Sequence, residues 1–220
     1  MLASIKSMLS SRVFPTGGIF TLHSGEVVPD PVCNYIFLVR SGLVIAERSV
    51  GKNRQDRLYF PGDIFGFQKM SDLQPLVGRR ERLIARGDVQ VEFWTTHELQ
   101  EFVDRYQVNS FELLQLLADT IEDEIVWATF RSGRALHRLV NLFLALNDRY
   151  GLQGIMPSIT HKDWASIVGI TRENVTSQLN KLEKGGLVES KRVGHRSQLH
   201  LSDVPGLKIL VGKTRESKRK

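Results

Sequence analysis

The sequence predicts an α+β protein with a β-rich N-terminal domain, a long helix and a small C-terminal domain. Short apolar runs separated by turn residues fill the first part of the chain, a heptad-like apolar repeat follows, and two short helical patterns then precede a hairpin pattern. We therefore expect a domain over residues 1–105, a long helix over 106–132, a second domain over 133–211 and a basic tail over 212–220.

The N-terminal domain contains runs of β-branched and aromatic residues that are typical of strands. These runs cover residues 35–39, 43–47, 57–60, 82–85 and 89–94. Turn signals such as Ser41-Gly42 and Gly87-Asp88 separate them. Short strands with such frequent turns predict a sandwich or a barrel.

Capping residues predict where the next helices begin and end. Thr95 or Thr96 is the candidate N-cap of a short helix that has Glu98 in its first turn. A later helix, roughly residues 133–150, is expected to end at Gly151, where a left-handed backbone is easily accommodated.

The long predicted helix carries an apolar seam with spacings of 3, 4, 3, 4 and 3 residues. The seam consists of Phe111, Leu114, Ala118, Ile121, Ile125 and Ala128. Other apolar side chains lie off the seam, so the helix has two apolar sides and needs two partners. One partner is the β-domain, and a second copy of the helix supplies the other, as in a two-stranded coiled coil. The alternative is an ordinary core helix with a broad apolar face.

Residues 160–182, THKDWASIVGITRENVTSQLNKL, predict two helices joined by a tight turn. Thr160 and Asp163 form a potential capping box for the first helix. Gly169 permits the turn, and Thr171 caps the second helix. This arrangement is a helix-turn-helix, in which the second helix enters the major groove of DNA.

The outer side of the second helix has the chemistry needed to read bases. Arg172 can donate two hydrogen bonds to guanine, and Glu173 can accept one from cytosine. Alternatively, Glu173 is only a first-turn acid that the helix dipole favours. The predicted base-reading residues are Arg172, Glu173, Thr176 and Ser177. The predicted phosphate contacts are Thr160, His161, Lys162, Thr171, Lys181, Lys191, Arg192 and Arg196.

A β-hairpin follows this helix directly. Residues 187–190 and 198–201 read as two strands, and the basic segment KRVGHRS joins them. The hairpin is expected to be a wing that contacts phosphates, and the alternative is a solvated basic hairpin.

The basic charge lies in the same region. Residues 160–220 hold 13 Lys and Arg against 6 Asp and Glu, whereas residues 1–159 hold 17 against 18. This asymmetry predicts contact with a polyanion. A basic disordered tail would give a similar bias, but residues 160–211 alone still carry a net charge of +3.

Several functions are not expected from the composition. Cys33 is the single cysteine, so it forms no internal disulfide and holds no structural zinc alone. The six histidines lack metal-ligand spacing, and no nucleophile–base motif is present. No apolar run is long enough to span a membrane. We therefore expect a cytoplasmic protein that has no cofactor or metal and is not an enzyme. The alternatives are a non-specific architectural DNA-binding protein and a β-domain enzyme.

The chain resembles the family of the cyclic-AMP receptor protein and the fumarate–nitrate regulator, the CRP/FNR family. The resemblance rests on GITRENVTSQLNKLEKGGLV (169–188), FPGDIFGF (60–67) and RSGLV (40–44). It implies a β-roll similar to the cyclic-nucleotide-binding jelly roll, a long dimerisation helix and a C-terminal winged helix-turn-helix. It also implies a homodimeric transcription regulator that binds palindromic double-stranded DNA and contacts RNA polymerase.

Two departures from the family pattern alter these expectations. Phe67 stands where members that bind cyclic AMP have a ribose-binding glutamate, and the neighbours of Arg79 and Arg80, the candidate effector-binding arginines, are charged. Cyclic AMP is therefore not expected, and any effector is unidentified. Ser177 stands where the family has a third base-reading arginine, so a half-site similar to TGTGA is expected only in the part that Arg172 and Glu173 read.

Overall fold

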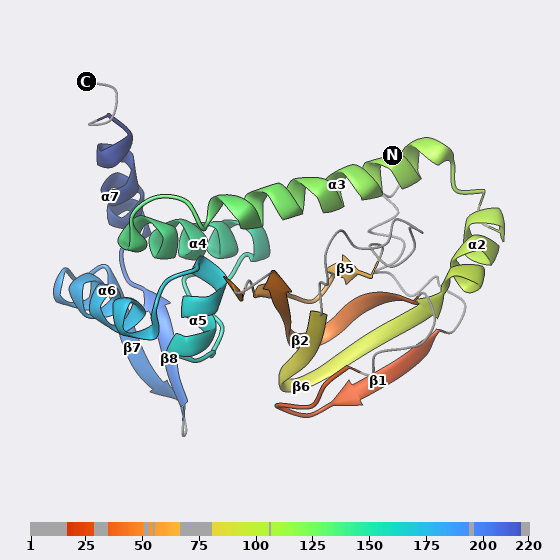
Figure 1. Ribbon diagram of the computed structural model, residues 1–220, viewed down its shortest axis with the longest axis horizontal. Coiled ribbons are helices and arrows are strands. Elements are labelled where there is room, and N and C mark those ends of the chain that lie inside the picture. Colours follow the sequence, from red (N-terminus) through yellow and green to blue (C-terminus); the bar gives the residue numbers. More distant parts are fainter. Residues whose placement is uncertain are drawn as a thin grey trace. The chain divides into compact units, whose positions relative to one another are not determined.

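The computed structural model describes residues 17–28, 35–50, 53–54, 56–66, 81–105, 107–193 and 196–216. The chain divides into two compact units, residues 1–125 and 126–220, and Figure 1 labels their helices and strands. The predicted α+β fold is confirmed. The division falls inside the long helix, whereas the sequence placed the start of the second domain after that helix, at residue 133.

An antiparallel sheet forms the body of the first unit. Its strands are β1 (Gly18–Leu22), β2 (Tyr35–Val50), β3 (Asn53–Arg54), β4 (Arg57–Tyr59), β5 (Ile64–Phe65) and β6 (Glu81–Thr95). The long strands β2 and β6 pair from Tyr35 opposite Thr95 to Arg48 opposite Glu81. Among the described strands the path runs β1-β6-β2-β3, and β4 and β5 also pair with β2. This path does not close, so the barrel, one of the two predicted alternatives, is wrong.

The predicted turns at Ser41-Gly42 and Gly87-Asp88 do not end strands; they are irregularities within the long strands β2 and β6. The runs 35–39 and 43–47 are parts of β2, and the runs 82–85 and 89–94 are parts of β6. Gly42 has a φ of +80°, and a Cβ there would lie 2.3 Å from the carbonyl oxygen of Asp88. Such a position requires glycine, and the extra residues of β6 opposite it form a bulge that bends the strand pair.

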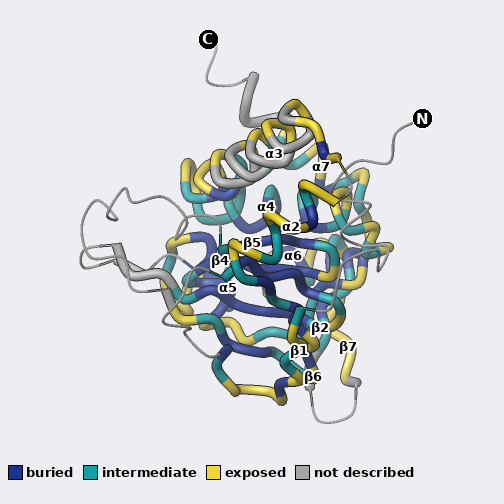
Figure 2. Tube along the Cα trace, turned by 90° about the vertical axis from the view of Figure 1, so that its right-hand side faces the viewer, coloured by how far each residue is buried: buried dark blue, intermediate teal, exposed yellow. Residues whose placement is uncertain are grey.

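A second irregularity changes which side chains of β2 face the main core, because between Val39 and Ser41 strand β2 has one residue more than β6. Before it, Phe37 and Val39 lie in the core, whereas after it the even-numbered Val44 and Ala46 do. Figure 2 shows in dark blue that the strands of this sheet are buried along much of their length. The opposite face of β2 packs under α2 (Thr96–Arg105), in a cluster that includes Trp94. The sheet therefore has apolar packing on both faces at this end.

The FPGDIFGF motif forms a turn that is fixed to β2. The Phe60 N–H donates to the Asp63 carboxylate at 2.9 Å, and the Gly62 N–H donates to the Val39 carbonyl at 2.9 Å. The Val39 N–H in turn donates to the Asp63 carbonyl at 3.1 Å. Other residues named from the sequence, Phe67, Arg79, Arg80 and Cys33, lie outside the described residues.

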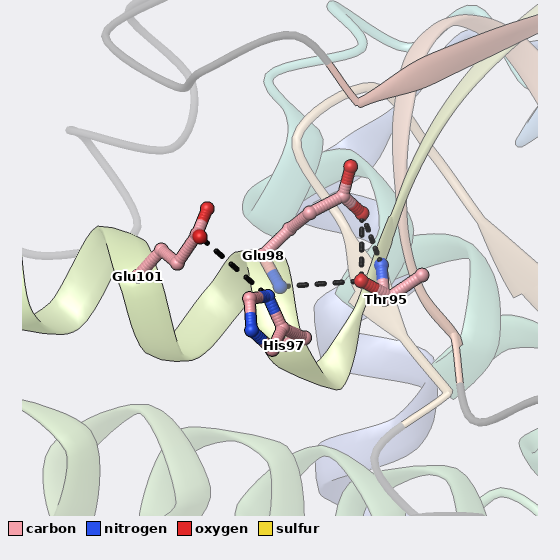
Figure 3. A network of polar contacts seen from close by, with 4 residues as sticks. All are labelled: Thr95, His97, Glu98 and Glu101. Atoms are coloured by element: carbon pink, nitrogen blue, oxygen red, sulfur yellow. Dashed lines mark hydrogen bonds and ion pairs between the residues drawn. The ribbon is translucent and has the colours of Figure 1, made fainter.

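A capping box starts α2, as Figure 3 shows. The Glu98 N–H donates to Thr95 Oγ1 at 3.2 Å, and the Glu98 carboxylate accepts from the Thr95 N–H at 2.7 Å. The Thr95 hydroxyl donates to the same carboxylate at 2.9 Å. Thr95 is thus the cap, and the helix begins at Thr96. His97 Nδ1 lies 3.6 Å from Oε1 of Glu101, which is one turn further along the helix.

Hydrogen bonding at the β1 end of the first unit gives a prediction about pH. His23 Nδ1 lies 3.0 Å from Asp88 Oδ1, and this contact, with the charges of Glu26 and Asp88, raises the pKa of His23. The contact between protonated His23 and Asp88 therefore contributes its full stabilisation below the pKa of histidine in the unfolded chain. This stabilisation is lost as the pH rises through the raised pKa of His23. We expect Asp88→Asn to lower the His23 titration midpoint measured by NMR. Ser24→Ala is the control, and an unchanged midpoint in Asp88→Asn would contradict the assignment.

Helix α3 (Ser110–Thr129) confirms the long helix, and its seam is exposed in the single chain. Phe111, Leu114 and Ile125 are 73%, 62% and 60% exposed, and the smaller Ala118 and Ala128 are exposed as well. The side chain of Ile121 lies outside the described residues. Off the seam, Trp127 is buried and packs edge-on against Phe130.

The second unit continues with α4 (Ala135–Tyr150), α5 (His161–Val168), α6 (Arg172–Lys184), β7 (Val188–Val193), β8 (Arg196–Leu201) and α7 (Val204–Glu216). Helix α4 ends at Gly151 as predicted, with a φ of +58°. Helix α7 continues as far as Glu216, so part of the predicted tail 212–220 is helical. Among the described residues, no helix has the length and apolar character needed to cross a membrane.

Candidate nucleic-acid interface

Helix α5 begins with the predicted capping box. The Asp163 N–H donates to Thr160 Oγ1 at 3.1 Å, and the Asp163 carboxylate accepts from the Thr160 N–H at 3.1 Å and from its hydroxyl at 2.8 Å. Asp163 is buried, so these bonds replace the water that its carboxylate would otherwise bind. The helix ends at Gly169, which has a φ of +68° and makes the tight turn into α6.

The cap predicts a measurable contribution to stability. Thr160→Ala should lower the free energy of unfolding by about 0.5–2 kcal/mol, because it removes the cap and one partner of a buried carboxylate. Urea denaturation followed by tryptophan fluorescence measures the change. Thr160→Ser keeps the hydroxyl and should stay close to the original protein, and equal stability of the alanine variant would contradict the role of the cap.

Helix α6 packs on α4 and α5 through one apolar face. Thr171 caps it by accepting from the Asn174 N–H at 3.2 Å, as predicted. Its inward residues Val175, Leu179 and Leu182 are all buried. Behind it, Trp164 of α5 lies edge-on to Phe143 of α4, with ring centroids 5.1 Å apart.

The outward face of α6 collects the residues predicted to read bases. Arg172, Glu173 and Ser177 are exposed, and Thr176 is half-buried. A shallow hollow runs along this face and is lined by Arg172, Glu173, Thr176, Ser177, Asn180, Lys181 and Lys184. Sequence reasoning missed Asn180 and Lys184. Their positions follow from the buried positions of α6 and the 3.6-residue period, which place both on the opposite side of the helix.

Thr176, a predicted base-reading residue, is hydrogen-bonded to His161, a residue that was predicted to contact phosphate. The Thr176 hydroxyl lies 3.1 Å from the Arg172 carbonyl oxygen and 2.9 Å from His161 Nδ1. The carbonyl can only accept, so the hydroxyl donates its single hydrogen to it. His161 must therefore donate from Nδ1, and its Nε2 is the ring atom left for other contacts.

Another contact that sequence reasoning missed holds the turn between α5 and α6. Arg138 of α4 donates from Nη1 to the Gly169 carbonyl at 3.1 Å and from Nε to the Gly133 carbonyl at 2.8 Å. A guanidinium can serve two carbonyls because its donors point in fixed directions. This link crosses 31 residues of sequence, so no local pattern announces it.

The predicted wing is an antiparallel hairpin of β7 and β8, paired from Val188 opposite Leu201 to Val193 opposite Arg196. Lys191 and Arg192 are exposed on β7, and Lys191 forms an ion pair with Glu189 at 3.2 Å. His195 and the side chain of Arg196 lie outside the described residues. Nearer the helix, the Ser190 hydroxyl donates to the Glu183 carboxylate of α6 and ties the wing to that helix.

The remaining predicted phosphate contacts lie in two groups around α6. Thr160, His161 and Lys162 are exposed at the start of α5, and Thr171 and Lys181 are exposed on the cap and outer side of α6. Helix N-termini and cationic side chains are the groups that bind phosphates. Among the described residues, no group of three or more metal-ligating side chains could hold an ion.

This arrangement, a tightly turned helix pair with an attached β-hairpin, defines the second unit as a winged helix-turn-helix domain. Residues 137–210 match the Crp-like helix-turn-helix domain. The chain is thus a two-unit protein in which a DNA-binding domain follows a β-roll.

Solved structures share the fold of the whole chain. FixK2 from Bradyrhizobium japonicum is 22% identical, with a TM-score of 0.67 over 89% of this chain and 98% of its own. A CooA mutant from Carboxydothermus hydrogenoformans is 22% identical, with a TM-score of 0.65 over 89% and 88%. A CRP-family transcriptional regulator from Thermus thermophilus is 20% identical, with a TM-score of 0.62 over 88% and 96%.

No curated protein sequence matches the chain significantly. The domain match and the shared fold nevertheless agree with the motifs in the sequence. The predicted resemblance to the CRP/FNR family is confirmed in the helix-turn-helix domain and in the fold.

Proposed function

We propose that the protein is a sequence-specific transcription regulator that binds palindromic double-stranded DNA as a homodimer. The observation that supports this most strongly is the outward face of α6, where Arg172, Glu173, Thr176 and Ser177 line one hollow opposite the buried face. A helix that is anchored on one side and polar on the other is suited to the major groove.

Each side chain on this face has a different task in the proposal. Arg172 donates to guanine O6 and N7, and Glu173 accepts from cytosine N4. Ser177 has a short side chain, so the base that an arginine would read there is read weakly. The cations at the start of α5, on α6 and on the wing bind phosphates and set the register.

The exposed seam of α3 supports the homodimer. Phe111, Leu114 and Ile125 present large apolar side chains in a heptad register, and water is an unfavourable environment for such a stripe. A second copy of α3 offers the same register and covers it. A dimer presents two copies of α6, so half-sites about one helical turn apart are expected.

Regulation would act through the β-roll and through RNA polymerase. The proposal assigns no cyclic AMP to the β-roll, because Phe67 replaces the glutamate that holds the ribose. Contact with RNA polymerase follows from the class of protein, and the surface that makes it is not assigned.

Selection of bound sequences from a random pool of double-stranded DNA tests the proposal. We expect an enriched palindrome with a conserved guanine and cytosine in each half-site. An enriched set without two-fold symmetry would contradict the homodimer. A pool that is bound without enrichment would favour the architectural alternative, in which the same basic surface holds any DNA.

A further inference from the structure

The hydrogen bonds of Thr176 restrict what this side chain offers to DNA. Its only hydroxyl hydrogen is given to the Arg172 carbonyl, and one lone pair of the oxygen accepts from His161 Nδ1. The hydroxyl therefore has no hydrogen left to donate to a base. Two groups on Thr176 are not engaged in these bonds: the second lone pair of the oxygen and the methyl group.

The methyl group suits one base in particular. Of the four base pairs, only those with thymine present a methyl group in the major groove, and threonine methyl groups make apolar contacts with it. Thr176 lies on α6 one turn after Arg172 and beside Ser177, on the wall of the hollow. The side chain is half-buried, and its hydroxyl is held between the Arg172 carbonyl and His161 Nδ1.

His161 keeps Thr176 in this orientation. Its ring is at the start of α5, and its Nδ1 lies 2.9 Å from the Thr176 hydroxyl in the second turn of α6, 15 residues later in the sequence. Without the imidazole, the threonine side chain could rotate and exchange the places of its hydroxyl and methyl groups.

We infer that Thr176 reads a thymine in each half-site through its methyl group, and that His161 is a positioning residue for this contact. This inference rests on the proposed function, because it requires α6 to lie in the major groove. It assigns a second class of base contact to the site, apolar rather than hydrogen-bonded, next to the Arg172 and Glu173 readers.

Uracil provides the test, because it differs from thymine only by the missing methyl group. Each thymine of the selected half-site is replaced in turn by uracil, and affinity is measured by fluorescence anisotropy at fixed salt. At one position we expect a loss of about three- to fivefold, the effect of one buried methyl group. Thr176→Ser should bind the thymine site more weakly by the same factor and should not distinguish thymine from uracil there.

Thr176→Val separates the two remaining groups of the threonine. It keeps a methyl group and has no oxygen, so it should still prefer thymine to uracil at that position. The inference is wrong if uracil has no effect on the original protein and Thr176→Val loses the base preference at the position that Thr176 reads. The second lone pair of the hydroxyl would then accept from an amino group of the base.

His161 variants distinguish positioning from phosphate binding. A positioning role predicts that His161→Ala reduces the thymine-to-uracil ratio towards one, and that His161→Asn, which keeps an N–H donor, restores part of it. A phosphate contact alone would lower the affinity for all DNA and leave this ratio unchanged. Selection of a palindrome without any uracil-sensitive position would overturn the inference and leave the proposed function intact, whereas failure to select any sequence would overturn the proposed function itself.

Discussion

Replacing Leu114 and Ile125 together with glutamate is expected to convert the homodimer into monomers. Both side chains are about 60% exposed in the single chain and lie in the apolar seam of α3. In a dimer they would be buried against the partner helix, where four carboxylates without cationic partners are strongly unfavourable. Sedimentation velocity should therefore show the mass of one chain.

The same double variant should lose at least about a hundredfold in affinity for a palindromic site. A monomer contacts only one half-site, whereas specific complexes exceed non-specific ones by roughly 10³–10⁷ when both halves are engaged. The matched control is Leu114→Met with Ile125→Leu, which keeps the seam apolar and should remain dimeric. A glutamate variant that still sediments as a dimer would show that the seam of α3 is not the interface.

Arg172→Ala is expected to cost about 1–3 kcal/mol on the cognate site, which corresponds to roughly 5- to 150-fold in affinity. The loss arises because Arg172 is exposed in the first turn of α6 and is assigned two hydrogen bonds to one guanine. The preference for guanine at that position should relax, while preferences elsewhere in the half-site persist. Binding to a set of single-base variants of the selected site measures both effects.

Lys181→Ala is the control for Arg172→Ala. Lys181 is assigned to phosphate, so its loss should weaken binding to cognate and random DNA by similar factors. The slope of log affinity against log salt should also fall by about one. If Arg172→Ala gives this same uniform pattern, Arg172 contacts phosphate and not a base.

The parts of the fold that depend on neighbouring residues were predictable from the sequence. Thr160 with Asp163 and Thr171 with Asn174 form helix caps, which use side chains and backbone groups three residues apart. The exposed face of α6 followed from the spacing of its apolar residues. Local hydrogen bonding and helical periodicity are sufficient for such features.

Features that depend on distant residues were not predictable. The sequence around Gly42 predicts a turn, but the glycine lies at a bulge within a continuous β2. The cause is the Asp88 carbonyl of β6, which approaches Gly42 closely and is distant in sequence. The bonds from Arg138 to the turn at Gly169 and from His161 to Thr176 join separate helices. A single sequence contains no local signal for these contacts.

The specificity ratio tests the central claim most directly. It is the affinity for the selected palindrome divided by the affinity for random double-stranded DNA of equal length, measured by competition at one near-physiological salt concentration. Sequence-specific reading by α6 predicts a ratio of about a thousand or more. A ratio near one would show that the basic surface binds DNA without reading it, and the protein would then be an architectural DNA-binding protein.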